Sequence, residues 1–296
     1  MLAPREAGEH ASCCHGAGSA TVRQRERRPV SGDDRIGRVL SRERTYHSQL
    51  RKTKGVARFL NGNSITYSAR RNDFAFSCVR EKLFEALKRK ECNPGSRLLN
   101  IACGAGQDMP YVLPLTRRVV CLDIARAVLE INRERFRVPC VEADALRIPM
   151  EDCSFDYVLA NGFLHHVVEL GLDGFLAEFK RVLAPGGWVI VAEPNLLFPV
   201  FVATRPLHKL FPGFSGLVEH ERPISSRQLF RCIRRAGFAE VECEPASYVH
   251  NRFPLPLSKA IYRSHGVLTA MPLVRWLGYT TVACGQKPRT CSERSD

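Results

Sequence analysis

Short apolar runs alternate with segments of helical periodicity through the middle of the chain, and this alternation constrains the fold more than any other feature. Parallel strands need a long crossover connection, usually a helix, so the alternation predicts an α/β fold with a mostly parallel sheet and helices on both faces. The strands predicted here are residues 98–102, 119–122, 138–142, 155–160 and 188–192, the last after a turn at 184–187, and the predicted helices start near 107, pass through 128–131 and cover 173–183.

The flanks extend the same pattern into a Rossmann-like seven-stranded sheet. Apolar residues at helical spacing over residues 74–87 predict a preceding helix, which the turn Asn-Pro-Gly at 93–95 ends. Prolines interrupt the region before the last strand, which therefore reads as irregular, and the last strand is expected to be antiparallel at an edge. The predicted elements are a helix at 225–236, a strand at 238–244, an irregular segment at 245–272 and a final strand at 279–284.

The chain divides into a basic leader, one folded domain and a short tail. Eleven basic and four acidic residues lie between Arg23 and Lys54, so this segment carries half of the net charge of +14. A segment of this composition without apolar periodicity is predicted to be a disordered, solvated tail, although its charge also suits nucleic acid or anionic lipid. The predicted divisions are residues 1–57 for the leader, 58–285 for the domain and 286–296 for the tail.

The twelve cysteines are expected to be structural thiols. No two are spaced as CxxC, and several fall inside or beside predicted strands, where a free thiol behaves as a small buried hydrophobe. This arrangement predicts no metal site and a reducing compartment, so the protein is expected to be cytoplasmic. The longest apolar stretch, residues 196–203, is too short to cross a bilayer and contains Pro199.

The stretch LLNIACGAGQD, residues 98–108, joins the first strand to two glycines and an acid. Gly104 and Gly106 predict a backbone turn that a ligand can approach closely. Met109 stands where a dinucleotide-binding GxGxxG pattern has its third glycine, and Asp108 places a negative charge at the start of the next helix. Both features disfavour a phosphate and favour a cationic ligand without phosphate, of which S-adenosylmethionine is one.

Two further acids follow the next two predicted strands. Asp123 ends the second strand, where its carboxylate can accept hydrogen bonds from both hydroxyls of a ribose. Asp144 follows the third strand, where its carboxylate and the amide of Ala145 can recognise an adenine edge. Ile124 and Leu146 could enclose the adenine ring. The alternative for Asp144 is a turn or cap role, since Asp favours turns.

These signals, in this order, resemble a class I S-adenosylmethionine-dependent methyltransferase, closest to the type 11 methyltransferase domain. The matching stretches are LLNIACGAG, Asp123, EADALRIP with Asp144, FDYVLANGFLHHV and LAPGGWVIV, within a cofactor-binding core at residues 97–193. Asn100 departs from the pattern, because many relatives have Asp there. The resemblance implies S-adenosyl-L-methionine as cofactor, bound by Ala102, Cys103, Gly104, Gly106, Asp123, Ile124, Asp144, Ala145 and Asn161.

Two adjacent histidines follow the fourth predicted strand, near the expected position of a methyl acceptor. Methyl transfer needs a dedicated base only when the acceptor is a poorly ionised hydroxyl or a carbon acid. His165 and His166 are therefore the candidate catalytic residues. A positioning or structural role is the alternative for each.

The acceptor is expected to be a small, apolar molecule. Base-amino methylation usually goes with an Asn-Pro-Pro-aromatic turn, but this chain reads Asn161-Gly162-Phe163, which disfavours nucleic acid. The segments 194–224 and 245–277, which are apolar and are read as helical and proline-rich, are predicted to form a lid. Such a lid suits a quinone-, polyketide- or lipid-like acceptor and would allow peripheral membrane contact.

Other functions remain open from the sequence alone. An NAD(P)-dependent Rossmann oxidoreductase or epimerase is one alternative, although the third glycine is replaced and no Tyr-x-x-x-Lys pair is visible. A nucleic-acid methyltransferase and a non-catalytic binding protein with a methyltransferase-like fold are the others. The sequence does not indicate an oligomeric state.

Overall fold

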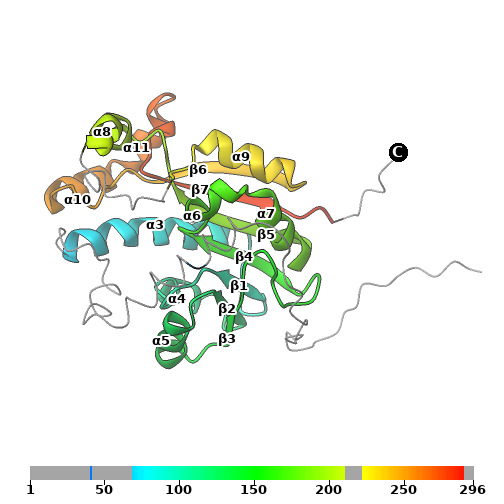
Figure 1. Ribbon diagram of the computed structural model, residues 1–296. Helices are drawn as coiled ribbons and strands as arrows, with labels where there is room; N and C mark the ends of the chain where they lie inside the picture. The colour runs from blue at the N-terminus through cyan, green and yellow to red at the C-terminus, as the bar shows by residue number, and fades with distance from the viewer. Residues whose placement is uncertain (1–40, 42–68, 211–221, 290–296) are drawn as a thin grey trace, which may run out of the picture.

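The computed structural model describes residue 41 and residues 69–210 and 222–289 (Figure 1). The predicted leader therefore lies almost entirely outside the described residues, as does most of the tail. The elements are α3 (Ala69–Arg89), β1 (Leu98–Ile101), α4 (Met109–Val112), β2 (Val119–Asp123), α5 (Arg126–Phe136), β3 (Cys140–Glu142), β4 (Phe155–Asn161), α6 (Leu164–Val167), η1 (Val168–Leu170), α7 (Asp173–Val182), β5 (Leu183–Pro194), α8 (Pro199–Leu210), α9 (Ser226–Arg235), β6 (Ala239–Ser247), α10 (Leu255–Arg263), α11 (His265–Ala270), η2 (Val274–Trp276) and β7 (Thr280–Gln286).

The predicted seven-stranded, mostly parallel sheet is confirmed. Its strand order is β3-β2-β1-β4-β5-β7-β6, and the first five strands in this order are parallel. The last strand of the chain, β7, is antiparallel as predicted, but its predicted place at an edge is wrong. It lies between β5 and β6, and pairs antiparallel with both. A strand with neighbours on both sides is shielded from solvent, and all residues of β7 except the last are buried.

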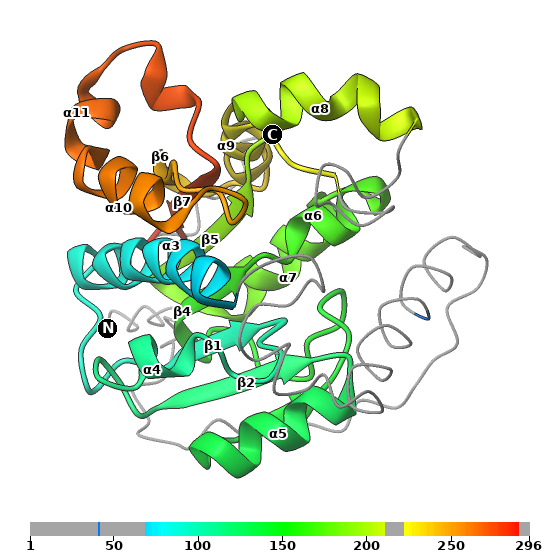
Figure 2. The same ribbon diagram turned by 90° about the vertical axis from the view of Figure 1, so that its left-hand side faces the viewer.

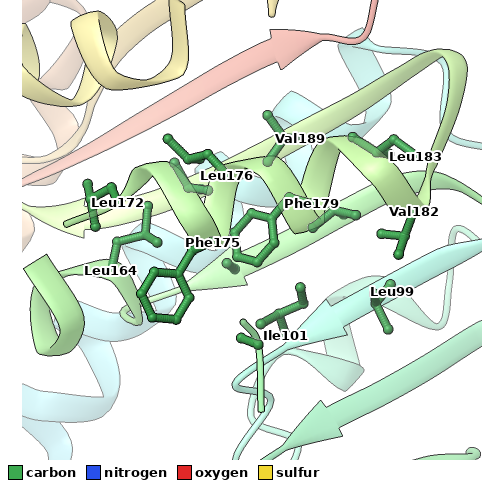
Figure 3. Packing of buried hydrophobic residues seen from close by; sticks show 14 of the residues in the cluster. Leu99, Ile101, Leu164, Leu172, Phe175, Leu176, Phe179, Val182, Leu183 and Val189 are labelled. Atoms are coloured by element: carbon green, nitrogen blue, oxygen red, sulfur yellow. The ribbon is translucent and has the colours of Figure 1, made fainter. Parts of the chain in front are cut away.

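Helices cover both faces of the sheet, as predicted. One face packs against α7 and α9 through a cluster that includes Phe175, Phe179 and Leu229 (Figure 3 shows the α7 side). The opposite face packs against α3, α4 and α5 through a second cluster that includes Leu83, Val112 and Leu129. Because the parallel strands are buried on both faces, they read as continuous apolar runs rather than as alternating ones.

The strand order reverses between β1 and β4, and the carboxyl ends of these two strands are where a ligand crevice is expected. From β1 the chain builds outward through β2 and β3, then returns to add β4 on the other side of β1. In open α/β sheets, ligands bind where the strand order reverses in this way. The glycine turn after β1 and the histidines after β4 therefore lie at the same edge of the sheet.

Two predictions of irregular structure are wrong. The expected turn at residues 184–187 lies inside β5, which begins already at Leu183 and passes a register shift before Trp188 pairs with Tyr157. The segment 245–272 is also more regular than predicted. Its first residues complete β6, and α10 and α11 follow. Pro254 precedes α10 and Pro256 lies in its first turn, where the missing proline N–H removes no helical hydrogen bond.

The described parts of the segments predicted to form a lid contain the helices α8, α10 and α11, and an aromatic cluster lies between these segments. In both views α8, α10 and α11 lie at one end of the molecule, away from α5 (Figures 1 and 2). The ring of His250 stacks on Phe198 with centroids 5.4 Å apart and meets Tyr279 edge-on at 4.9 Å. Phe201 packs on the same histidine at 6.0 Å. The cluster thus connects the segment after β5 to those after β6 and before β7.

The buried His250 should make stability depend on pH. Burial, with a smaller contribution from the Arg252 charge, lowers the pKa of His250 to about 4. The unfolded chain binds this proton near pH 6.5, so the free energy of unfolding should fall by about 3 kcal/mol in total as the pH drops from about 6.5 through 4. Chemical denaturation of the wild type and of His250→Leu across this window measures the effect. An equal slope in both would contradict it.

The described cysteines are reduced, and most of those with a shifted pKa are buried. Nine described cysteines are free thiols, five of them buried, and burial raises the pKa of Cys243 and Cys284 to about 12. Such thiols are poor nucleophiles and act as core residues. Within the described ranges, no helix combines the length and apolar character that a bilayer crossing requires.

Candidate functional site

The glycine turn after β1 is held in a conformation that requires glycine. Gly104 and Gly106 have φ values of +51° and +80°. A Cβ at Gly106 would lie 2.6 Å from Oδ1 of Asn132 in α5, closer than any normal contact. Asn132 is fully buried, and its Nδ2 lies 3.4 Å from Sγ of Cys103. The turn is therefore pressed against α5, and its other side faces the crevice.

Ala102, the first residue of this turn, also adopts the left-handed conformation, with φ of +50°. A residue with a Cβ pays about 1–2 kcal/mol for this region, and glycine does not. The strained backbone lies directly after the strand at the proposed cofactor site. Strain of this kind persists only where the surrounding structure fixes the turn.

Replacing Ala102 by glycine is expected to stabilise the fold. Relief of the left-handed strain outweighs the extra entropy of glycine in the unfolded chain, so Ala102→Gly should raise the free energy of unfolding by about 0.5–1 kcal/mol. Urea denaturation checks this change. A loss of stability would show that packing of the Ala102 methyl group matters more than the strain.

Asp123 lies at the carboxyl end of β2 and holds the turn in place. Its side chain is buried, with Oδ2 accepting from the amide of Gly104 and Oδ1 from the amide of Ala125, both at 2.9 Å. Each carboxylate oxygen can accept more than one hydrogen bond. The carboxylate can therefore bind a diol while it keeps the backbone bonds that shape the crevice.

The residues after β3 lie beside this carboxylate. The amide of Ala143 donates to the carbonyl of Asp123 at 3.0 Å, which ties the two strand ends together. Asp144 accepts a hydrogen bond from the amide of Leu146 at 2.9 Å, so it does shape a turn, as the alternative reading expected. Ala145 is buried and Ile124 is partly exposed. These positions remain candidates for contact with an adenine.

Asn161 ends β4 and meets an ion pair that the sequence did not reveal. Its Nδ2 donates to Oδ1 of Asp108 at 2.9 Å, and Arg80 of α3 donates Nε to the same oxygen at 3.0 Å. Asp108 is thus already paired with Arg80, and its expected role toward a cationic ligand stays a prediction. Asn100 lies fully buried in β1, and neither of its side-chain polar atoms has a partner among the described residues.

Glu193, at the end of β5, organises the start of α6. It is fully buried, and its Oε1 accepts from the amides of Phe163 and Leu164 at 3.1 and 2.7 Å. Its Oε2 lies 2.7 Å from the ring Nδ1 of His165 and accepts from the same residue's amide at 3.2 Å. Because a carboxylate only accepts, Nδ1 carries a ring proton in this contact, and Nε2 is the ring nitrogen that Glu193 does not bind. The ring of His166 lies beside it, with centroids 4.1 Å apart.

The structure brings most of the sequence-predicted residues to one edge of the sheet. Ile101 is paired with Leu122 and with Ala160, so the residues that follow these three strands are neighbours. Sequence reasoning missed Glu193, Arg80 and Asn132. Glu193 carried a usable signal, because it is an acid that ends a buried strand in WVIVAEP, just as Asp123 ends VVCLD. Arg80 and Asn132 lie on helices with no local signal of their role.

The middle of the chain matches a known family model. The model is described as a methyltransferase domain and matches residues 99–191. Those residues begin in β1 and end inside β5, and they include the glycine turn, Asp123 and the two histidines. The match therefore covers the part of the chain that forms the crevice.

Individual proteins resemble longer or shorter parts of the chain. A demethylmenaquinone methyltransferase of Clavibacter sepedonicus is 38% identical over 105 residues, a match that covers 33% of this chain and only 41% of that protein. A solved S-adenosylmethionine-dependent methyltransferase of Thermotoga maritima, described as a possible histamine N-methyltransferase, has a TM-score of 0.53 at 17% identity, covering 84% of this chain and 98% of that one. The [4+2]-cyclase SpnF has a TM-score of 0.55 at 19% identity, covering 84% and 97%. The solved structures share the fold, and the cyclase illustrates that this fold carries more than one reaction.

Proposed function

We propose that this S-adenosylmethionine-dependent methyltransferase passes a methyl group to a small, hydrophobic acceptor of the quinone, polyketide or lipid-like kind. The observation that carries the proposal is the anchored carboxylate of Asp123 beside a glycine turn at the switch point of the sheet. The alternatives from the sequence, a dinucleotide enzyme and a nucleic-acid methyltransferase, lack any comparable support in the site.

The residues of the crevice fit the proposed cofactor. A Cβ at Gly106 would clash with Asn132 and Phe136 of α5, so glycine lets the turn pack closely on this helix and fixes the backbone that would meet the cofactor. Asp123 keeps acceptor capacity for the two ribose hydroxyls, and Asp144 with Ala145 lies next along the sheet edge, where an adenine would extend. When bound, the cofactor supplies a methyl carbon already activated by a positively charged sulfur.

The chain's own residues then have three tasks. The turn at 102–106 and Asp123 hold the cofactor, and the lid segments exclude water and position the acceptor, which supplies most of the acceleration by proximity. His165 takes the proton of a hydroxyl or carbon acid at Nε2, because Glu193 holds the opposite ring nitrogen and orients the ring. His166 is the second candidate, and its position beside the ring of His165 suits a packing role.

Two observations support an apolar acceptor. Phe198, Phe201 and Phe253 surround His250 at the carboxyl side of the sheet, so the lid is aromatic where it meets the domain. The relative of Clavibacter sepedonicus carries the name of an enzyme acting on demethylmenaquinone. Both point to an apolar acceptor rather than a nucleic acid or a charged metabolite.

A transfer assay with labelled cofactor tests this proposal. The full-length protein is incubated with tritiated S-adenosylmethionine and a cell extract, and the products are divided into an organic phase, an aqueous small-molecule fraction and a macromolecular fraction. The proposal predicts label in the organic phase, lost in the Asp123→Ala variant. Label confined to nucleic acid or to water-soluble products would overturn the assignment of the acceptor.

A further inference from the structure

The exposed large hydrophobic residues are concentrated on one part of the molecule. All those found among the described residues lie in two segments, 197–202 and 257–276, which belong to the lid. Single exposed hydrophobic residues are normal, but a cluster of them marks a surface that contacts something. The members are Leu197, Val202, Leu257, Tyr262, Val267, Met271, Leu273 and Trp276.

The cluster is densest around α11 and η2. Leu273, between these two helices, is 83% exposed, and Val267 on α11 is 68% exposed. Met271 and Trp276 flank Leu273 along the chain and are also exposed. The short helix α11 lies at the outer end of the molecule in both views (Figures 1 and 2), and η2 follows it along the chain. These side chains therefore project from the domain and do not cover the sheet.

The charged side chains of the chain segment that carries most of this cluster are all basic. The sequence contains no Asp or Glu from residue 245 to residue 292. Lys259, Arg263 and Arg275 are exposed on the same helices, and the guanidinium of Arg275 lies 5.2 Å from the ring centroid of Trp276. The acids beside this segment belong to other elements: Glu81 of α3 accepts a hydrogen bond from Tyr262, and the charges of Glu85 and Glu244 act on His265. We call Leu257, Val267, Met271, Leu273 and Trp276, with the three cations, the basic apolar patch.

We propose that the basic apolar patch docks on an anionic membrane surface, with Leu273 and Val267 entering the boundary between headgroups and acyl chains. Interfacial segments combine protruding aliphatic residues, a Trp at headgroup depth and Lys or Arg that meet acidic headgroups. The patch has all three within residues 257–276. A protein partner of ordinary composition would explain the apolar residues, but it would not explain why residues 245–289 carry basic side chains and no acidic one.

This docking would place the lid, and with it the entrance to the crevice, against the lipid. The helix α10 packs on α3 through Phe74 and Tyr262, whose rings lie 5.8 Å apart. The patch is thus fixed to the domain that carries the proposed active site. The inference stands on the surface residues alone and does not depend on methyl transfer.

Vesicle binding of the full-length protein tests the proposal. The variant Val267→Asp/Leu273→Asp places two negative charges at the most exposed positions, and Arg117→Asp makes the same change of net charge in an exposed loop before β2. Co-sedimentation with vesicles of mixed phosphatidylcholine and phosphatidylglycerol should show binding by the wild type and by Arg117→Asp. The double variant should bind at least about tenfold more weakly than the wild type. Replacing the mixed vesicles by pure phosphatidylcholine should reduce binding of the wild type.

Three results would overturn the proposal. One is a wild type that does not sediment with the anionic vesicles. Another is a double variant that binds as well as Arg117→Asp, which would assign binding to other basic parts of the chain. The third is a wild type that is a dimer and a double variant that is a monomer in analytical ultracentrifugation, because the occupant of the patch would then be a second copy. Thermal unfolding should be alike in all variants, since the substituted side chains are exposed.

Discussion

The Asp123→Ala variant is expected to bind S-adenosylmethionine about thirty- to a thousandfold more weakly than the wild type. A single charge-assisted hydrogen bond contributes roughly 1.5–3 kcal/mol, and two bonds to one carboxylate are not fully additive, so we expect the loss of both to cost about 2–4 kcal/mol of binding free energy. The amides of Gly104 and Ala125 also lose their acceptor. The turn then relaxes, which adds to the loss of affinity.

Asp156 provides a matched control for this variant. It lies at the opposite end of the parallel strands and accepts from the amide and the guanidinium of Arg97 at 2.8 Å each, and Arg97 holds its pKa below the usual value. Asp156→Ala should therefore lower stability without changing cofactor affinity. Calorimetric titration of both variants distinguishes a binding role from a structural one. An unchanged dissociation constant in Asp123→Ala would end the assignment of the ribose ligand.

The His165→Asn variant is expected to lower kcat by about a hundred- to ten-thousandfold, the usual contribution of a general base. Asparagine can place an amide N–H where Nδ1 of the ring now lies, so the hydrogen bond to Glu193 can be kept. What the variant loses is the acceptor nitrogen Nε2. Affinity for S-adenosylmethionine should change little, so the effect should appear in kcat and not in cofactor binding.

His166→Asn tests whether the effect belongs to one histidine. The two residues are adjacent, their ring centroids lie 4.1 Å apart, and the ring of His165 is hydrogen-bonded to Glu193. His166→Asn should cost less than about tenfold in kcat, a loss that repacking alone can explain. Equal losses in both variants would show a positioning role for the pair, and full activity of His165→Asn would show that the acceptor needs no base.

Much of the fold is predictable from sequence because parallel strands buried on both faces leave a strong signal. The runs LLNI and VVCLD have few interruptions, and each is followed by a turn and a helix, the short α4 after the first and α5 after the second. The place of β7 is not predictable in this way. Its insertion between β5 and β6 depends on pairing over long sequence distances, to which local pattern is blind. The bounds of the helices in the segment 245–277 were not predicted, because prolines at helix starts and in loops look alike in sequence.

The candidate site follows the same division. Asp123 and the glycines are visible because acids and glycines directly after buried strands have few structural reasons to be there. Glu193 was overlooked because its partner His165 is distant in sequence, and only the β4–β5 pairing brings them together. The ion pair of Arg80 with Asp108 joins the helix before the sheet to the glycine turn, which no spacing rule captures. The sequence therefore did not reveal that the acid Asp108 is paired with Arg80.

Calorimetric titration of the full-length protein with S-adenosylmethionine, and separately with NAD, tests the central claim most directly. The account predicts saturable binding of S-adenosylmethionine at one site and no heat from NAD, because the crevice offers a carboxylate for the ribose and lacks the third glycine of a phosphate-binding turn. Saturable binding of NAD with no response to S-adenosylmethionine would contradict it.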